Sequence, residues 1–287
     1  MTVELNRLVA EELAQPVDPR VADMAAAVAA RHGTASRTVL FYGSCLREKQ
    51  LEGLMLDFYL IVSDYRIAYD KPWLARANAL IPPNVFPFQH NGLAAKYAVL
   101  SEADFHRLNG PETRNVSVWA RFAQPSRLAW AVDDAAREAA VAAVARAAPT
   151  LLGAAGRIAG EGTLDWWRRA FSLTYSAELR AERKGRSGSV VDADPARYTL
   201  FSVPAAAAIE AGAESVGWAR RRIEGKALSV IRLAKASATY AGGADYIVWK
   251  INRHAGTDFA LKPWQRRHPL LGAISLLPRL LRSGAIR

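Results

Sequence analysis

The sequence lacks the features of a disulfide-stabilised, secreted or membrane-spanning protein. Cys45 is the one cysteine in 287 residues, which excludes an intramolecular disulfide and a multi-cysteine zinc site and is typical of a reducing compartment. No run of about 18 uncharged apolar residues occurs, so we expect no segment to span a bilayer. Residues 1–16 include acidic side chains and no continuous apolar run, so we expect no secretory signal there.

Several common catalytic motifs are also missing. The chain has no glycine-rich loop that ends in Gly-Lys-Ser/Thr, no His-Glu-x-x-His and no Gly-x-Ser-x-Gly sequence. The five histidines are scattered, and none pairs with another at helical spacing. We therefore interpret the histidines as structural residues rather than as metal ligands.

What the sequence does have is a strong positive charge. Lys and Arg number 38 and Asp and Glu number 27, which gives a formal net charge of +11. This balance favours anionic partners, such as nucleic acid, acidic lipid headgroups or phosphorylated small molecules. With 51% hydrophobic and 23% charged residues, the composition is that of a globular protein with one large domain or two modest ones.

The pattern of apolar and polar residues indicates an α+β protein, with an N-terminal mixed sheet and helices followed by a C-terminal helical domain. Runs of β-branched and aromatic residues predict strands over residues 37–42, 55–62 and 95–100. Helices are expected over residues 21–31, 71–80 and 101–108, and Ser101 is the expected N-cap of the last. The rest of the chain predicts an exposed loop over 184–197 and helices over 133–152, 164–183, 203–222 and 226–254.

We place the domain boundaries after residues 132 and 258, so that residues 259–287 form a tail. This tail carries Trp264, several leucines and six Lys or Arg residues. It resembles a basic amphipathic segment that lies at a membrane surface and is broken at Pro278. The alternative is a helix that packs on the body of the protein with a basic outer face.

A Gly-Ser pair and one aspartate carry the main chemical signal. Gly43 and Ser44 follow a predicted strand, and Asp57 lies 13 residues after Ser44 inside the next apolar strand. Gly43 would let the backbone approach a triphosphate, Ser44 would offer its hydroxyl and backbone N–H groups, and Asp57 would hold Mg²⁺ against the same phosphates. This pattern fits nucleotidyl transfer. However, Gly-Ser turns are common in α/β proteins, and a buried aspartate can be paired structurally.

Several short segments, in the same order, resemble one enzyme family. They read YGS and LDF, NG and KYAVL, VWARF and QP, YSAELR, and SVIR, at residues 42–44, 56–58, 91–92, 96–100, 118–122, 124–125, 175–180 and 229–232. They resemble the mitochondrial-type CDP-diacylglycerol synthases, which are phosphatidate cytidylyltransferases of the translocator-assembly-and-maintenance type within the polymerase-β-like nucleotidyltransferase superfamily. The likeness extends over residues 37–254.

The resemblance implies a nucleotidyltransferase-like fold for the N-terminal domain and a Mg²⁺-dependent reaction of CTP with phosphatidic acid. The products would be CDP-diacylglycerol and pyrophosphate. By this likeness, Gly43 and Ser44 contact the nucleotide triphosphate and Asp57 binds the metal. Lys96, on a predicted strand, would neutralise phosphate charge, although it could also be an ordinary exposed strand lysine.

Three residues of the C-terminal part complete the expected site. Glu178 is the candidate second metal ligand and a catalytic candidate, and Arg180 is a candidate nucleotide-binding residue. Arg232, in an apolar stretch, would meet the phosphate of the lipid. Solvent-facing helix charges are the alternative interpretation of all three residues.

The sequence also departs from this family and its superfamily. Many superfamily members carry a second carboxylate two residues after the first, where this chain has Tyr59. Ala120 and Ala177 stand where the family has glycine, and Glu178 stands where it has aspartate. We therefore leave two alternatives open: a nucleotidyltransferase with another acceptor (RNA, a small alcohol or a protein side chain), or an inactive relative that binds anionic lipid.

The expected location is cytoplasmic, with peripheral association to the inner face of the cell membrane and its anionic surface. No nucleic-acid partner is expected, because the chain has no paired carboxylates at this strand and no recognisable RNA-binding module.

Overall fold

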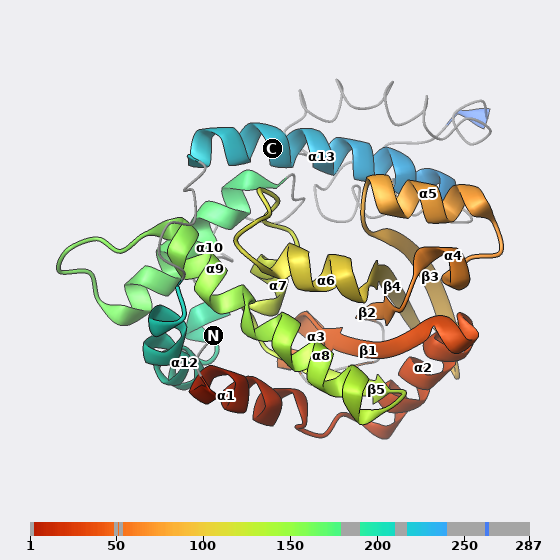
Figure 1. Ribbon diagram of the computed structural model, residues 1–287, viewed down its shortest axis with the longest axis horizontal. Coiled ribbons are helices and arrows are strands. Elements are labelled where there is room, and N and C mark those ends of the chain that lie inside the picture. The colour runs from red at the N-terminus through yellow and green to blue at the C-terminus, as the bar shows by residue number, and fades with distance from the viewer. Residues whose placement is uncertain are drawn as a thin grey trace.

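The computed structural model describes residues 3–48, 51, 54–178, 190–209, 217–239 and 262–263. Over these residues the fold is α+β, as predicted: a five-stranded mixed sheet with helices, and a helical C-terminal part (Figure 1). None of the described helices is both long enough and apolar enough to cross a membrane.

The strand order of the sheet is β3-β4-β2-β1-β5. The bounds are β1 Ser36–Tyr42, β2 Met55–Val62, β3 Asn84–His90, β4 Leu93–Ser101 and β5 Ser126–Ala131. β2 and β4 are parallel, and the other neighbouring pairs are antiparallel. β2 lies at the centre, which explains its nearly continuous apolar sequence, because side chains are buried on both faces of a central strand.

The described helices differ widely in length. They are α1 Val3–Leu13, α2 Pro19–Ala30, α3 Ser44–Glu48, α4 Tyr65–Ala68, α5 Pro72–Leu80, α6 Glu102–Asn109, α7 Trp119–Phe122, α8 Asp134–Ala145, α9 Ala147–Ala155, α10 Thr163–Ala177, α12 Pro195–Ala207 and α13 Trp218–Thr239. A 3₁₀ turn, Gly33–Ala35, precedes β1. Ser101 caps α6 as predicted, because its hydroxyl accepts a hydrogen bond of 3.2 Å from the Asp104 N–H.

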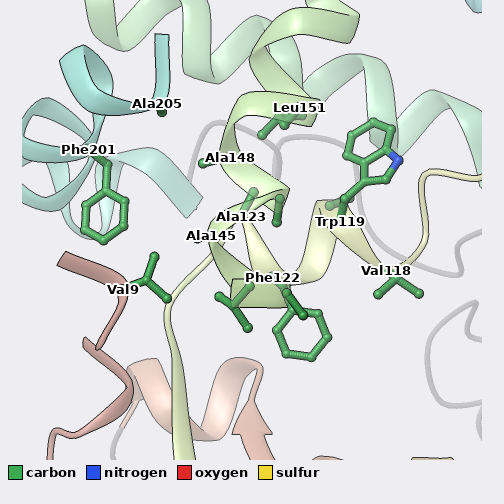
Figure 2. Packing of buried hydrophobic residues seen from close by; sticks show 14 of the residues in the cluster. Val9, Val118, Trp119, Phe122, Ala123, Ala145, Ala148, Leu151, Phe201 and Ala205 are labelled. Carbon is green, nitrogen blue, oxygen red and sulfur yellow. The ribbon is translucent and has the colours of Figure 1, made fainter. Parts of the chain in front are cut away.

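Two hydrophobic cores lie on opposite faces of the sheet. Alternate residues of the central strands enter each core, as the two-residue repeat of a strand requires. One core joins the sheet to α2, α4 and α5. The larger core joins the other face to α1, α6, α7, α8, α9, α10 and α12. Figure 2 shows part of it, including Trp119, Phe122, Leu151 and Phe201.

The larger core includes residues from both sides of the boundary expected after residue 132, for example Leu40 and Leu151. The domain boundaries therefore stay a prediction, and the tail at 259–287 lies outside the described residues apart from residues 262–263.

The secondary-structure prediction was wrong in several places. Helix α10 ends at Ala177 rather than at 183, and residues 208–209 and 217 of the helix expected over 203–222 are not helical. Helix α13 begins at Trp218 rather than at 226.

Residues 133–152 are not one helix, because α8 ends at Ala145 and α9 begins at Ala147. The loop predicted over 184–197 ends too late, because α12 begins at Pro195, with the Asp194 carboxylate accepting a hydrogen bond from the Arg197 N–H at 3.1 Å.

Candidate nucleotide and metal site

The register of the sheet brings the predicted site residues of two strands together. Asp57 of β2 is the cross-strand partner of Lys96 on β4 and of Tyr42 on β1. Cross-strand partners project from the same face of a sheet, so these three side chains form a row across β1, β2 and β4. The row lies toward the face that carries the larger core, next to the end of β1.

Asp57 and Lys96 form an ion pair at the protein surface. Lys96 Nζ lies 2.8 Å from Asp57 Oδ1, and the exposed fractions of the two side chains are 28% and 19%. The Asp57 Oδ1 atom is buried, and despite this short distance it accepts no hydrogen bond of suitable geometry from the described residues. The aspartate is therefore neutralised by the lysine and keeps lone pairs that no described donor uses.

Gly43 approaches Asp57 closely at the end of β1. Its φ of +96° lies in the region that favours glycine, and a β-carbon there would lie 3.0 Å from Asp57 Oδ2. Both the backbone conformation and the neighbouring carboxylate therefore require glycine at this position. Ser44 follows as the first residue of the five-residue helix α3 and is half-buried.

Tyr59 occupies the position where the superfamily often has its second carboxylate. Its side chain is buried on the same face as Asp57, with its ring 5.1 Å from that of Phe122 and 5.3 Å from that of Tyr42. Burial, followed by the nearby charges of Glu178 and Asp57, raises the pKa of Tyr59, although Arg121 and Arg232 act in the opposite direction. A carboxylate at this position would be inside the core, so the departure at Tyr59 has a packing explanation.

Glu178 lies against Arg121, at the end of α10. The Arg121 guanidinium of α7 is 3.6 Å from the buried Glu178 carboxylate, and its Nη1 also donates a hydrogen bond to the Ser117 carbonyl. Burial would lower the pKa of Arg121, but Glu178, Tyr59, Tyr42 and Asp57 together raise it. Arg121 therefore stays charged, and it interacts with both predicted metal ligands.

Two cations of α13 join this cluster. Arg232 Nη1 donates a 2.7 Å hydrogen bond to Ser117 Oγ, and its Nη2 donates to the Pro82 carbonyl. Lys235 Nζ donates to the Ile81 carbonyl and, at 2.8 Å, to the Pro83 carbonyl.

Burial disfavours the charged forms of Arg232 and Lys235. Burial lowers the pKa of Arg232 to about 10, and burial together with the charge of Arg232 lowers the pKa of Lys235 to about 7. The buried Arg232 Nε has no hydrogen-bond partner among the described residues. Arg121 and Arg232 thus place positive charge near Glu178, and Lys235 lies near Arg232.

The structure places the predicted residues in two groups. Gly43, Ser44, Asp57 and Lys96 lie together where β1 and α3 meet β2 and β4. Glu178 and Arg232 lie with Arg121, and a layer of Tyr42, Tyr59 and Phe122 packs beside both groups. Arg180 lies outside the described residues.

Sequence reasoning gave no role to Arg121, Ser117 or Lys235. Arg121 lies inside the segment VWARF, where a charge among apolar and aromatic residues was an available signal. The hydroxyl of Ser117 and the amine of Lys235 carried no comparable signal, because their roles depend on how α13 packs.

The donor set fits one divalent cation that is held mostly by substrate and water. Among the described residues, no group of three His, Cys, Asp or Glu side chains could hold a metal ion. Mg²⁺ typically takes only one or two protein carboxylates and completes its shell with phosphate oxygens and water. Asp57 suits that role because its Oδ1 accepts no hydrogen bond from the described part of the chain and its Oδ2 lies against the space left by Gly43. Whether Glu178 is a second ligand stays a prediction.

Comparison of the chain with protein-family models and with curated proteins finds no match.

Proposed function

We propose that the protein is a phosphatidate cytidylyltransferase, which transfers CMP from CTP to phosphatidic acid at a membrane surface. The observation that carries the proposal is the arrangement of Gly43, Asp57 and Lys96. Three features meet within one surface site: a strand-end glycine in a left-handed conformation, a carboxylate whose Oδ1 accepts no hydrogen bond from a described residue, and a lysine on the adjacent parallel strand that pairs with it by charge. The ordered motifs that resemble the mitochondrial-type CDP-diacylglycerol synthases support the choice of nucleotide and acceptor.

In this proposal the residues of the first group bind the triphosphate. Asp57 holds Mg²⁺, which would neutralise the phosphates and orient them for in-line displacement. Gly43 leaves room beside the carboxylate, and Ser44 offers its hydroxyl and backbone N–H to phosphate oxygens. When the nucleotide binds, the Lys96 ammonium would leave its ion pair with Asp57 and contact a phosphate oxygen. Its positive charge would then neutralise phosphate charge.

The second group binds the acceptor. A phosphate oxygen of phosphatidic acid forms a bond to the α-phosphorus of CTP, and the bond between the α- and β-phosphates breaks to release pyrophosphate. Arg232, whose Nε has no hydrogen-bond partner among the described residues, is the candidate to hold the acceptor phosphate with Arg121 beside it, since guanidinium groups form strong, charge-assisted hydrogen bonds to phosphate. Glu178 keeps Arg121 in position and remains the candidate for a second metal ligand, and Arg180 remains a candidate for nucleotide binding.

The test is incorporation of labelled CTP into chloroform-extractable product by the full-length protein with Mg²⁺. Vesicles of phosphatidylcholine with phosphatidic acid should support labelling, and vesicles of phosphatidylcholine alone should not. Parallel reactions with ATP, GTP and UTP measure nucleotide preference. If no lipid product forms while the folded protein still binds CTP, phosphatidic acid is not the acceptor. RNA, alcohols and proteins are then screened as acceptors. If the protein binds anionic vesicles but neither binds nor converts CTP, it is an inactive lipid-binding relative.

Replacing Gly43 with Ala should lower the rate of CTP incorporation by at least about 10-fold, because displacement of a metal-binding carboxylate by even a fraction of an ångström is costly in catalysis. It should also lower the free energy of unfolding by about 1–2 kcal/mol through backbone strain. Activity assays and urea unfolding measure the two effects.

Gly33→Ala is the matched control, since Gly33 also has positive φ but a β-carbon added there would meet nothing within 4 Å. It should lose stability and keep activity; equal loss of activity in both variants would contradict the role of Gly43.

A further inference from the structure

Helix α13 has one face fixed on the body of the protein and one face that the described residues leave uncovered. Along its inner face, Arg221 donates hydrogen bonds to the carbonyls of Thr113 and Arg114, and a β-carbon at Gly225 would overlap the Ala177 carbonyl oxygen. Further along, Arg232 is bonded to Ser117. These contacts fix the rotation of the helix, so the outer face is a defined surface.

The outer face combines exposed isoleucines with positive charge. Ile223 and Ile231 are 73% and 47% exposed, and the exposed Ala227 lies between them at helical spacing. Arg222 and Lys226 lie one turn apart along one edge of this face, are exposed, and form no ion pair with a described residue. We define these five residues as the α13 outer face.

The chemistry of this face points to its partner. Branched apolar side chains on the solvent side of a helix gain free energy only when something removes them from water. A nucleic-acid backbone would pair with Arg222 and Lys226 but would leave the isoleucines exposed. A bilayer surface provides a favourable environment for both kinds of side chain, because apolar groups enter the headgroup–acyl boundary while basic groups remain among the anionic headgroups.

The rest of the chain and a second copy of the chain are two other candidates to cover this face, and both carry the same sign of charge as the face. The sequence beyond Thr239 contains eight Lys or Arg and two Asp or Glu residues, so it is strongly basic like the face itself. A second copy of the chain would bring another Arg222 and Lys226 pair, and the formal net charge of +11 adds to this repulsion.

We propose that the α13 outer face is a docking surface for anionic lipid membranes. The helix has 22 residues and is therefore ~33 Å long, so it can lie in the interfacial plane along its length. Arg232 and Lys235 project from the other side of the same helix toward Ser117 and residues 81–83. Docking by the outer face would bring the candidate site to the membrane surface, with Arg232 and Lys235 themselves on the side of the helix that faces away from the lipid. This link to catalysis rests on the proposed function, whereas the surface can be tested without nucleotide.

The test is binding of the full-length protein to vesicles in the absence of CTP. The probes are vesicles of phosphatidylcholine alone and of phosphatidylcholine mixed with phosphatidylserine, an anionic lipid that is not the proposed substrate. The wild type should bind only the mixed vesicles, and less tightly as salt increases. Arg222→Gln with Lys226→Gln should weaken binding by about 30-fold, since each basic residue at an anionic surface contributes about 1 kcal/mol. Ile223→Gln with Ile231→Gln should weaken it by at least about 10-fold.

Two double variants are matched controls. Leu200→Gln with Val203→Gln removes two equally exposed apolar side chains from α12, and Arg20→Gln with Arg137→Gln removes two charges from α2 and α8. Neither should change vesicle binding. The proposal is overturned if the wild type does not bind the mixed vesicles, if the α13 variants bind as the wild type does, or if a control weakens binding equally. A wild-type dimer that the isoleucine variant converts to a monomer would assign the face to self-association instead.

The two proposals can fail separately. Vesicle binding that depends on α13, in a protein that does not convert CTP, would keep the docking surface and overturn the cytidylyltransferase. If both α13 variants convert CTP and vesicle-borne phosphatidic acid as fast as the wild type does, the cytidylyltransferase would stand and the docking surface would be overturned.

Discussion

Replacing Asp57 with Asn should lower CTP incorporation by about 10³-fold and leave the protein folded. The amide has the same shape as the carboxylate, so β2 and the close contact with Gly43 remain. It lacks the charge that, in our proposal, holds Mg²⁺, and it lacks the charge that pairs with Lys96 at 2.8 Å. Loss of one group that stabilises developing charge typically costs about 10²–10³-fold, and loss of the metal itself costs more.

The matched control for this prediction is Asp104→Asn. The Asp104 side chain is 16% exposed, close to the 19% of Asp57, and accepts hydrogen bonds of 2.6 Å from both Tyr65 and Arg107. Because these contacts lie away from the candidate site, the same chemical change there should cost some stability and little activity. Titration calorimetry with CTP and Mg²⁺ provides a second measurement, in which Asp57→Asn should lose the metal-dependent part of binding. Turnover within about 10-fold of the wild type would contradict the role assigned to Asp57.

The first group of site residues was predictable because it depends on local sequence. The strand before Gly43 and the apolar strand around Asp57 follow from residue periodicity, and the short connection between them fixes their antiparallel pairing. The alignment of Asp57 with Lys96 was not predictable in the same way. It requires β4 to lie parallel to β2, after a connection through α4, α5 and β3.

Strand β3 itself was missed for a physical reason. Its sequence, NVFPFQH, contains Pro87 and follows Pro82 and Pro83, which argue against a strand. Proline is tolerated because β3 is an edge strand, with a hydrogen-bonded neighbour on one side only. Whether a strand lies at the edge depends on the whole sheet, which short-range patterns do not contain.

The second group depends on contacts between distant residues. Ser117 and Arg232 are 115 positions apart in the sequence, yet their side chains share a hydrogen bond. The resemblance assigned Glu178 and Arg232 to one expected site, but it gave no role to Arg121, which interacts with both Glu178 and Tyr59. That arrangement follows from the packing of α7, α10 and α13 on the sheet, so it required the structure.

A buried ion pair between α1 and α12 should contribute strongly to the stability of the helical part. Arg197 of α12 donates two hydrogen bonds to the Glu12 carboxylate of α1, and a third, of 3.0 Å, to the Ala123 carbonyl. The guanidinium also lies 4.4 Å from the ring centroid of Phe201. Burial would lower the pKa of Arg197, but Glu12, with smaller contributions from Tyr198 and Asp194, outweighs burial and raises that pKa, so Arg197 stays charged.

Arg197→Met should therefore lower the free energy of unfolding by about 3–5 kcal/mol, because it leaves the Glu12 carboxylate buried without its partner. Urea unfolding at neutral pH measures this loss. The double variant Glu12→Leu with Arg197→Met should recover most of it, since an apolar pair of similar volume can replace a buried ion pair at little cost. Arg7→Met breaks exposed pairs with Glu4 and Glu11 on the same α1 helix and should change stability by at most about 1 kcal/mol. If the double variant is no more stable than Arg197→Met, the loss of stability comes from the contacts with Ala123 and Phe201 rather than from the unpaired charge of Glu12.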